Sequence, residues 1–202
     1  KNLEPLGMFS HFASASLAAH RSYSRKQIEI FEDTCRQLKQ AGFSNLIKSM
    51  SATGGTLFYP ESHMDMVRIG MGLYGYAPSC GLGSYIMKLK LKPVLTWKTF
   101  VSEIKELPAG SSVGYNFTYK NKHKSKIAIL PIGYWHGYDR RLSNKGEVLI
   151  HGKRAPVIGL VSMDMTIVDV TGIDKIKIGD EVALVGLQGK EVIWADELSQ
   201  KI

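Results

Sequence analysis

The sequence predicts an α/β segment followed by an all-β domain, and three observations lead to this fold class. Strand-like and helical runs alternate up to about residue 76, and short β-like runs separated by turns follow from about residue 91. A stretch rich in glycine and serine stands between them at residues 77–84 and resembles a linker. Alternation predicts a parallel sheet, whereas short, regularly spaced strands predict an all-β domain. We therefore place one domain at residues 1–85 and another at residues 86–202.

The first segment is predicted to contain a strand at 6–12, an amphipathic helix and a second strand at 45–50. The helix is expected to begin at Ser24, because Gln27 completes a capping-box pattern, and to end near Gly42. Its apolar side chains fall on one face: Ile28, Phe31, Cys35 and Leu38. The few strands available cannot close a barrel, which normally needs eight, so we expect either a small open sheet or part of a longer protein.

The second segment is predicted to form short strands at residues 93–97, 127–130, 148–150, 157–161 and 182–185. Turn sequences separate them, among them Pro108–Gly110, His151–Lys153 and Gly179–Asp180. This pattern is typical of an all-β domain.

Composition excludes several classes of protein. The chain has 202 residues, 44% of them hydrophobic, which suffices for a folded core. It contains no run of about 20 apolar residues, as a membrane span requires, and we expect no signal peptide, because no charged-then-apolar segment stands at the start. Cys35 and Cys80 are too few for a disulfide framework and lack metal-ligand spacing. We therefore expect free thiols, a cytoplasmic location, no membrane contact and no metal site.

The net charge of +8 raises the question of nucleic-acid binding, because lysine and arginine neutralise phosphates. The lysines, however, alternate along residues 88–92 and 120–126 as on solvated strands or a loop. No zinc-finger, helix-turn-helix or aromatic RNA-binding motif accompanies them. We expect no nucleic-acid partner.

Arg68 stands directly before a glycine-rich turn at residues 70–75, after a run able to form a buried strand. Such a turn leaves backbone N–H groups unpaired and lets an anion approach, because glycine has no Cβ. The guanidinium adds a fixed charge and directional donors. The pattern indicates a phosphate site, although a glycine-rich strand end that only turns a corner is an equally open interpretation.

Five motifs occur in an order that resembles the fold-type III alanine racemases, which depend on pyridoxal 5'-phosphate. They are Phe9–Ala13, Arg68–Gly75, Val113–Tyr115, Pro131–Tyr134 and Ser162–Asp164. The resemblance extends along nearly the whole chain. It implies the last strands and helices of a (β/α)8 barrel, followed by a C-terminal β-domain of barrel-like form. It also implies an enzyme that interconverts L- and D-alanine and supplies D-alanine for peptidoglycan.

The resemblance implies pyridoxal 5'-phosphate as cofactor and places residues around it. His11 would meet the pyridine ring, although from the residues alone it is a hydrogen-bonded core histidine. Arg68 would face the pyridine nitrogen. Because arginine keeps its proton, that nitrogen stays unprotonated, which disfavours transamination. The phosphate would bind the N–H groups of Gly70 and Met71 and the hydroxyl of Thr53.

Racemisation needs two acid/base groups on opposite faces of a planar carbanion. The resemblance makes Tyr115 one of them. It implies that Tyr115 reaches from one subunit into the barrel of the other, so that the active site exists only in a homodimer. A core residue with a satisfied hydroxyl is the structural alternative for Tyr115.

The resemblance adds residues that would line the pocket and bind the substrate: Tyr134, Met163, Asp164 and Arg140. The Met163 backbone N–H would lie near the substrate carboxylate, and Arg140 would lie at the entrance. Three of these residues also have a structural alternative. Met163 could be a core side chain, Asp164 could cap a turn, and Arg140 could be a solvated surface residue.

The resemblance places the Schiff-base lysine, which is also the second acid/base, upstream of Lys1. We therefore expect this chain to be a C-terminal fragment that does not racemise alanine alone. Two alternatives stay open, namely a serine or broad-specificity amino-acid racemase and a non-catalytic β-domain protein that binds a small phosphate ligand or a partner. A gene that encodes an upstream barrel with a lysine-bearing strand would favour the racemase.

Overall fold

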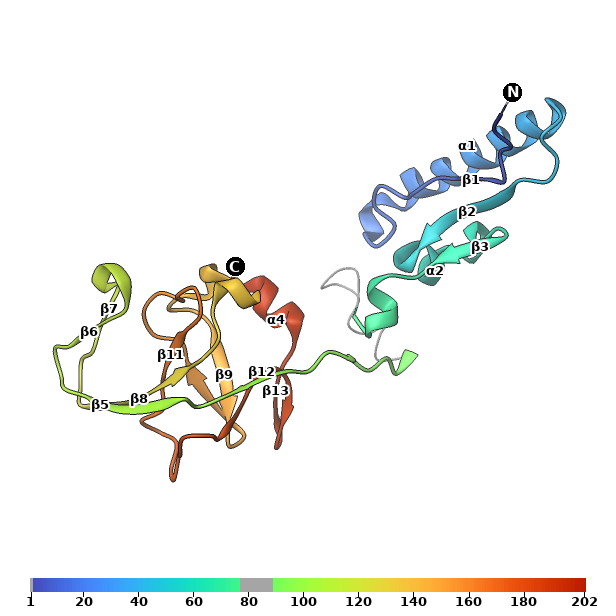
Figure 1. The fold of residues 1–202 in the computed structure, drawn as a ribbon. Coiled ribbons are helices and arrows are strands. Elements are labelled where there is room, and N and C mark those ends of the chain that lie inside the picture. The colour runs from blue at the N-terminus through green and yellow to red at the C-terminus, as the bar shows by residue number, and fades with distance from the viewer. Residues whose placement is uncertain (1, 77–88) are drawn as a thin grey trace. The chain divides into compact units, whose positions relative to one another are not determined.

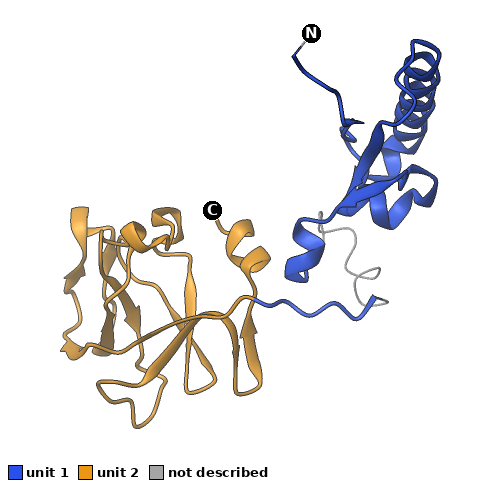
Figure 2. Cartoon of the chain, turned by 45° about the vertical axis from the view of Figure 1, so that its right-hand side comes forward, with its two compact units in different colours: residues 1–94 blue, residues 95–202 orange. Residues whose placement is uncertain are grey.

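The computed structural model describes residues 2–76 and 89–202. The chain divides into two compact units, unit 1 at Lys1–Val94 and unit 2 at Leu95–Ile202 (Figure 2). The predicted linker at residues 77–84, the predicted boundary after residue 85 and Cys80 lie outside the described residues. Each unit has its own hydrophobic core.

Unit 1 is built on a parallel sheet with the strand order β1–β2–β3 (Figure 1). The strands are β1 (Gly7–Phe9), β2 (Ile47–Ala52) and β3 (Met66–Arg68); helix α1 (Arg21–Gln40) connects the first two, and α2 (Thr53–Phe58) follows β2 directly. Phe9 pairs with Ser49, and Ala52 pairs with Arg68. The parallel pairing confirms the predicted strand–helix–strand unit. It also brings the C-terminal ends of the strands to one edge of the sheet.

Helix α1 begins three residues earlier than predicted, at Arg21, and the predicted capping box is wrong. Ser24 is fully buried within the helix, and its hydroxyl donates to the Ser14 carbonyl at 3.5 Å. The Gln27 side chain accepts a hydrogen bond from the Ala13 N–H at 3.2 Å. Both residues therefore tie the helix to the segment that follows β1, and this tertiary role overrides the local capping pattern.

The core of unit 1 joins α1 to the sheet. Phe12, Ile28, Phe31, Met50 and Tyr59 form it, and the Phe12 and Tyr59 rings stack with their centroids 5.2 Å apart. The predicted apolar face of α1 is confirmed, because Ile28 and Phe31 are buried and Cys35 packs against them. Elsewhere the sheet leaves apolar side chains exposed around an open cavity: Leu6, Phe9, Ile47 and Met66. Exposed apolar area of this kind is typical of a surface that contacts a ligand or another protein segment.

Unit 2, which the structure describes throughout, is an antiparallel all-β domain (Figure 1). One sheet has the order β10–β9–β12–β13 with β4 also paired to β12, a second has the order β11–β8–β5, and β6 pairs with β7. The elements are β4 (Trp97–Phe100), β5 (Glu103–Leu107), β6 (Ser112–Val113), β7 (Tyr119–Lys120), β8 (Ser125–Leu130), β9 (Glu147–Ile150), β10 (Lys153–Pro156), β11 (Thr166–Asp169), β12 (Glu181–Gln188), β13 (Glu191–Ile193) and α4 (Ala195–Gln200).

Strands β8, β9 and β12 confirm the predictions at 127–130, 148–150 and 182–185. Two predicted strands are wrong. The strand expected at 93–97 begins only at Trp97. The run at 157–161 is not a strand, because Val157 forms only an isolated bridge with Val168 and Gly159 turns the chain with φ of +73°. Val157, Ile158 and Val161 are buried in a loop that packs on the core, whereas Leu160 is half-buried.

Tyr138 is fully buried in the core of unit 2, and its hydroxyl has no hydrogen-bond partner in the described structure. Burial, with a smaller effect of the Glu147 carboxylate, raises the pKa of this hydroxyl well above its usual value. An unpaired buried donor costs about 1–3 kcal/mol. We expect Tyr138→Phe to raise the free energy of unfolding by about 1 kcal/mol in chemical denaturation. A lower free energy of unfolding would show that the hydroxyl has a stabilising partner.

Candidate active site

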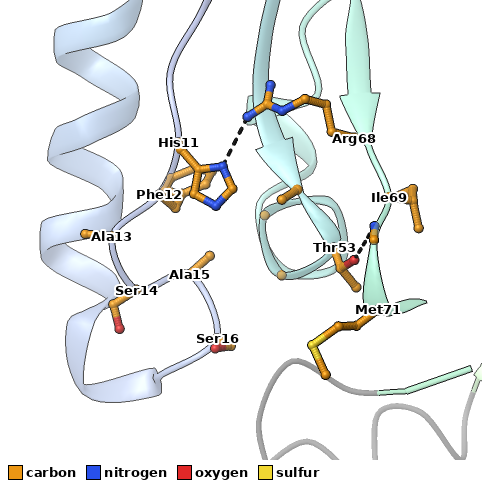
Figure 3. Close-up of a pocket in the computed structure, with 14 residues that line it drawn as sticks. His11, Phe12, Ala13, Ser14, Ala15, Ser16, Thr53, Arg68, Ile69 and Met71 are labelled. Carbon is orange, nitrogen blue, oxygen red and sulfur yellow. Dashed lines mark hydrogen bonds between the residues drawn. The ribbon is translucent and has the colours of Figure 1, made fainter. Parts of the chain in front are cut away.

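Arg68 ends β3, and its guanidinium reaches across β2 to the segment that follows β1, where it lies beside His11 (Figure 3). Its Nη2 donates to the carbonyls of Ser10 at 2.7 Å and Met50 at 3.3 Å, and its Nη1 donates to the Ser49 hydroxyl. Its Nη2 also lies 3.3 Å from Nδ1 of His11. Because a guanidinium only donates, Nδ1 of His11 is the acceptor of this bond.

The positive charge of Arg68 is fixed but not neutralised. No carboxylate lies within 4 Å of it in the described part of the chain, and its guanidinium lies 5.3 Å from the centroid of the Phe9 ring. The side chain is half-buried. Arginine stays protonated at every physiological pH, so the group offers a permanent, oriented cation to a ligand.

Thr53 begins α2 and binds the glycine-rich turn from the opposite side (Figure 3). Its buried hydroxyl accepts hydrogen bonds from the N–H groups of Gly70 at 3.1 Å and Gly72 at 3.3 Å. A Cβ added at Gly70 would meet nothing within 4 Å, whereas one at Gly72 would lie 2.9 Å from the Thr53 methyl group. The turn therefore leaves open space at Gly70, although the Gly70 N–H, which we expected to bind the phosphate, donates to Thr53.

Close packing below α2 sets the position of Thr53. A Cβ added at Gly55 would lie 2.7 Å from the Ser51 hydroxyl and 2.8 Å from the Phe12 ring. The Ser51 hydroxyl is itself buried and lies 2.5 Å from that of Ser62. Glycine at position 55 thus lets the helix lie directly on the core.

An open cavity of about 470 Å³ lies between these groups, a size typical of small-molecule sites. All the residues predicted to contact the cofactor line it: His11, Thr53, Arg68, Gly70 and Met71. Sequence reasoning missed Gly72, which the Gly-x-Gly spacing could have indicated. It also missed the acceptors of Arg68 at Ser10 and Met50, because backbone carbonyls carry no residue-type signal.

The predicted substrate residues lie in unit 2, where a glycine brings two loops together. The Tyr134 N–H donates to the Ser162 carbonyl at 3.0 Å, and the Trp135 N–H donates to the Met163 carbonyl at 2.9 Å. A Cβ at Gly133 would lie 2.2 Å from the Ser162 carbonyl oxygen. Only glycine fits there, so Tyr134 is held beside the loop that carries Met163.

Arg140 belongs to the same group. Its guanidinium lies 5.8 Å from the centroid of the Tyr134 ring, within the range of a cation–π contact. Neighbouring Asp139 instead pairs with Arg141 at 2.6 Å, and hydrogen bonds from Arg141 lower the pKa of that carboxyl to about 2. Arg140 itself has no carboxylate within 4 Å among the described residues, so its charge is available to an anion.

Tyr115 starts a short 3₁₀ helix, Tyr115–Phe117, and 67% of its surface is exposed. Because its side chain is exposed, Tyr115 is not a core residue of unit 2, which was the structural alternative to a catalytic role. Asp164 is exposed in the turn after Met163, whose side chain is also exposed. The structure thus joins Tyr134, Arg140 and the Met163 loop directly, whereas Tyr115 projects from a separate segment.

Residues 2–76 and 89–202 contain no helix that is both long and apolar enough to cross a membrane. They also contain no cluster of three or more His, Cys, Asp or Glu side chains suited to a metal ion.

Comparison with known proteins gives consistent matches along the chain. Residues 1–78 match the family described as alanine racemase, N-terminal domain, and residues 94–202 match alanine racemase, C-terminal domain. The alanine racemase of Symbiobacterium thermophilum is 42% identical over 198 residues, which are 98% of this chain and 52% of that protein. The chain therefore spans about half the length of this curated relative.

Solved structures agree with these matches. The alanine racemase from Bacillus anthracis with bound L-Ala-P has a TM-score of 0.90 and 34% identity, over 96% of this chain and 49% of that one. The alanine racemase from Bartonella henselae with covalently bound pyridoxal phosphate has a TM-score of 0.79 and 30% identity, over 97% and 51% of the two chains.

Proposed function

The chain belongs to the alanine racemase family, and from this premise we propose that the protein interconverts L- and D-alanine with pyridoxal 5'-phosphate. The observation that carries the proposal is the cavity of unit 1, in which Arg68, His11 and the Thr53 turn converge. We also propose that the parallel strands of unit 1 form part of a (β/α)8 barrel. Their exposed apolar side chains support this.

The residues of the cavity fit the cofactor. The open space at Gly70, whose own N–H donates to Thr53, would admit the phosphate, and the neighbouring N–H of Met71 and the hydroxyl of Thr53 would bind it. Arg68 would face the ring nitrogen and His11 the ring itself. When bound, the cofactor supplies an electron sink that acidifies the α-carbon of an amino acid. Arg68 keeps its own proton and would leave the ring nitrogen unprotonated, which limits side reactions such as transamination.

Tyr115 would move the proton on one face of the substrate. A tyrosine hydroxyl starts with a pKa near 10, so a neighbouring group must accept its proton or stabilise the phenolate. The other face requires a second acid/base, which we assign to a lysine outside this chain. Tyr115 and Phe117 are both exposed on the short 3₁₀ helix of unit 2. We propose that this surface meets a second subunit, so that Tyr115 serves the partner's cofactor in a homodimer.

The other residues of unit 2 would bind the substrate. Tyr134, the Met163 backbone N–H and Asp164 would line the pocket, and the unpaired charge of Arg140 would attract the substrate carboxylate at the entrance. We place the enzyme in the cytoplasm, where the free thiol of Cys35 stays reduced and D-alanine is made for peptidoglycan.

The test is to incubate the full-length gene product with pyridoxal 5'-phosphate and L-alanine and to measure D-alanine by chiral chromatography. D-alanine production supports the proposal, and a protein that binds the cofactor but produces none overturns it. A parallel assay with L-serine decides the serine or broad-specificity alternative, because the proposal requires a higher kcat/KM for alanine. Failure to bind the cofactor at all would favour a non-catalytic binding protein.

Thr53 allows a separate test of the phosphate site. Thr53→Val keeps the shape of the side chain but removes the hydroxyl, and hydrogen bonds to charged groups contribute about 1.5–3 kcal/mol. We expect the Kd for pyridoxal 5'-phosphate to rise roughly 10- to 100-fold in the full-length protein, measured by absorbance titration. Thr53→Ser is the matched control, because it keeps the hydroxyl. Equal losses in both variants would show that the hydroxyl does not bind the phosphate.

A further inference from the structure

Asn144 connects two loops of unit 2 through its side-chain amide. Its Oδ1 accepts a hydrogen bond from the Gly159 N–H at 2.7 Å, and its Nδ2 donates to the Thr118 hydroxyl at 3.2 Å. Thr118 directly follows the 3₁₀ helix that Tyr115 begins. One side chain therefore links the Tyr115 segment to the loop that continues toward Met163.

The Tyr115 segment needs such a link because its backbone is strained. Phe117 has φ of +51°, a left-handed conformation that bulky residues rarely adopt, and the preceding Asn116 has φ of +58°, which asparagine tolerates better. Conformations of this kind persist only where the surrounding structure determines them. The backbones also touch directly, since a Cβ at Gly114 would lie 3.1 Å from the Leu160 nitrogen, and one at Gly159 would lie 2.9 Å from the Val113 carbonyl oxygen.

The neighbouring Ser143 extends this connection to the segments that carry the predicted substrate residues Arg140 and Met163. Its hydroxyl donates to the Arg140 carbonyl at 2.5 Å and accepts from the Val161 N–H at 2.9 Å. Ser143 and Asn144 together thus contact the segments that carry Tyr115, Arg140 and Met163. Asn144 itself has φ of +57°, which asparagine tolerates better than most residues.

We infer that Asn144 is a positioning residue, which holds the Tyr115 segment against the loop at residues 158–165. The inference rests on the proposed function, in which Tyr115 moves a proton at the substrate. Asn144 does not touch the reacting atoms. It acts by fixing the geometry of Tyr115, where a displacement of about 1 Å is enough to cost up to 100-fold in rate.

The first arm of the test measures kinetics of the full-length holoenzyme. Asn144→Gly removes both hydrogen bonds without adding backbone strain, and Thr118→Val removes one of them from the other side. We expect kcat to fall roughly 10-fold in each variant, with KM for alanine within threefold of wild type, because orientation is lost and binding is not. The double variant that combines Asn144→Gly with Thr118→Val should have the same kcat as Asn144→Gly alone, because the two residues share one interaction. Asn144→Asp keeps an acceptor for both neighbours and should restore most of kcat.

The second arm measures hydrogen exchange of the amides of residues 115–118 in the protein without cofactor. Faster exchange is expected in Asn144→Gly. Gln188→Ala is the matched control, because the Gln188 amide also accepts from a backbone N–H, that of Gly152 at 3.0 Å, and donates to the Glu181 carbonyl at 3.0 Å. This control should leave kcat and the exchange of residues 115–118 unchanged.

Wild-type kcat in Asn144→Gly, or unchanged exchange at residues 115–118, would overturn the inference. A loss of kcat in Gln188→Ala as large as in Asn144→Gly would also overturn it. The loss of kcat would then reflect lower stability of the protein and not the position of Tyr115. If wild-type protein does not racemise alanine, the proposed function fails and the assigned role fails with it. Faster exchange in Asn144→Gly would then still establish that Asn144 holds the loop.

Discussion

Tyr115→Phe is expected to reduce kcat of the full-length protein roughly 1000-fold while leaving its pyridoxal phosphate content unchanged. The change removes one oxygen and keeps the aromatic ring. Tyr115 is exposed and outside the core of unit 2, so the fold should not be affected. Racemisation requires a proton carrier on each face of the α-carbon, and phenylalanine cannot carry a proton. The measurement is D-alanine formation per bound cofactor.

Tyr23→Phe provides the matched control, because Tyr23 is an exposed tyrosine of α1 that does not line the cavity. Its kcat should equal that of wild type. Retention of more than roughly a tenth of wild-type kcat in Tyr115→Phe would contradict the catalytic role, because general acid/base catalysis normally contributes at least 100-fold.

Arg68→Ala is expected to abolish measurable cofactor binding and to lower the free energy of unfolding by about 2–3 kcal/mol. The guanidinium is the donor for the Ser10 and Met50 carbonyls and the Ser49 hydroxyl, so its removal leaves these acceptors without it. The same change removes the permanent cation of the cavity. Absorbance titration with pyridoxal 5'-phosphate and chemical denaturation measure the two effects.

Arg68→Lys separates charge from geometry. Lysine keeps the positive charge but not the planar fork that reaches several acceptors at once. We expect the free energy of unfolding of Arg68→Lys to lie between those of wild type and Arg68→Ala. We also expect Arg68→Lys to bind the cofactor measurably but more weakly than wild type. Wild-type stability and affinity in Arg68→Lys would show that only the charge matters and would contradict the role of the hydrogen-bond network.

The helices and strands could largely be predicted from the sequence, because their buried apolar residues recur at regular spacing. Ile28 and Phe31 recur at helical spacing and do form the inner face of α1. The local pattern at Ser24 failed, because that residue bonds to a loop instead of capping the helix. The run at 157–161 failed for a similar reason. Its side chains are buried as a strand's would be, but Gly159 takes a positive φ that ends any strand.

The candidate site could be predicted residue by residue, but not its internal connections. Arg68 and the glycine-rich turn have a sequence pattern with a physical meaning, and the structure places them at one cavity with His11. The contact between the Tyr134 and Met163 loops has no such pattern, because it depends on the close approach that Gly133 allows. The roles of these residues in catalysis and binding stay predictions until variants are measured.

The most direct test measures the optical rotation of alanine solutions that contain the full-length protein and pyridoxal 5'-phosphate. One reaction starts from L-alanine and the other from D-alanine. We expect both reactions to converge on the same racemic mixture, and Tyr115→Phe to slow both while the cofactor stays bound. A signal that stays constant from either enantiomer, with cofactor bound to wild-type protein, would contradict the assignment of this chain to a working alanine racemase.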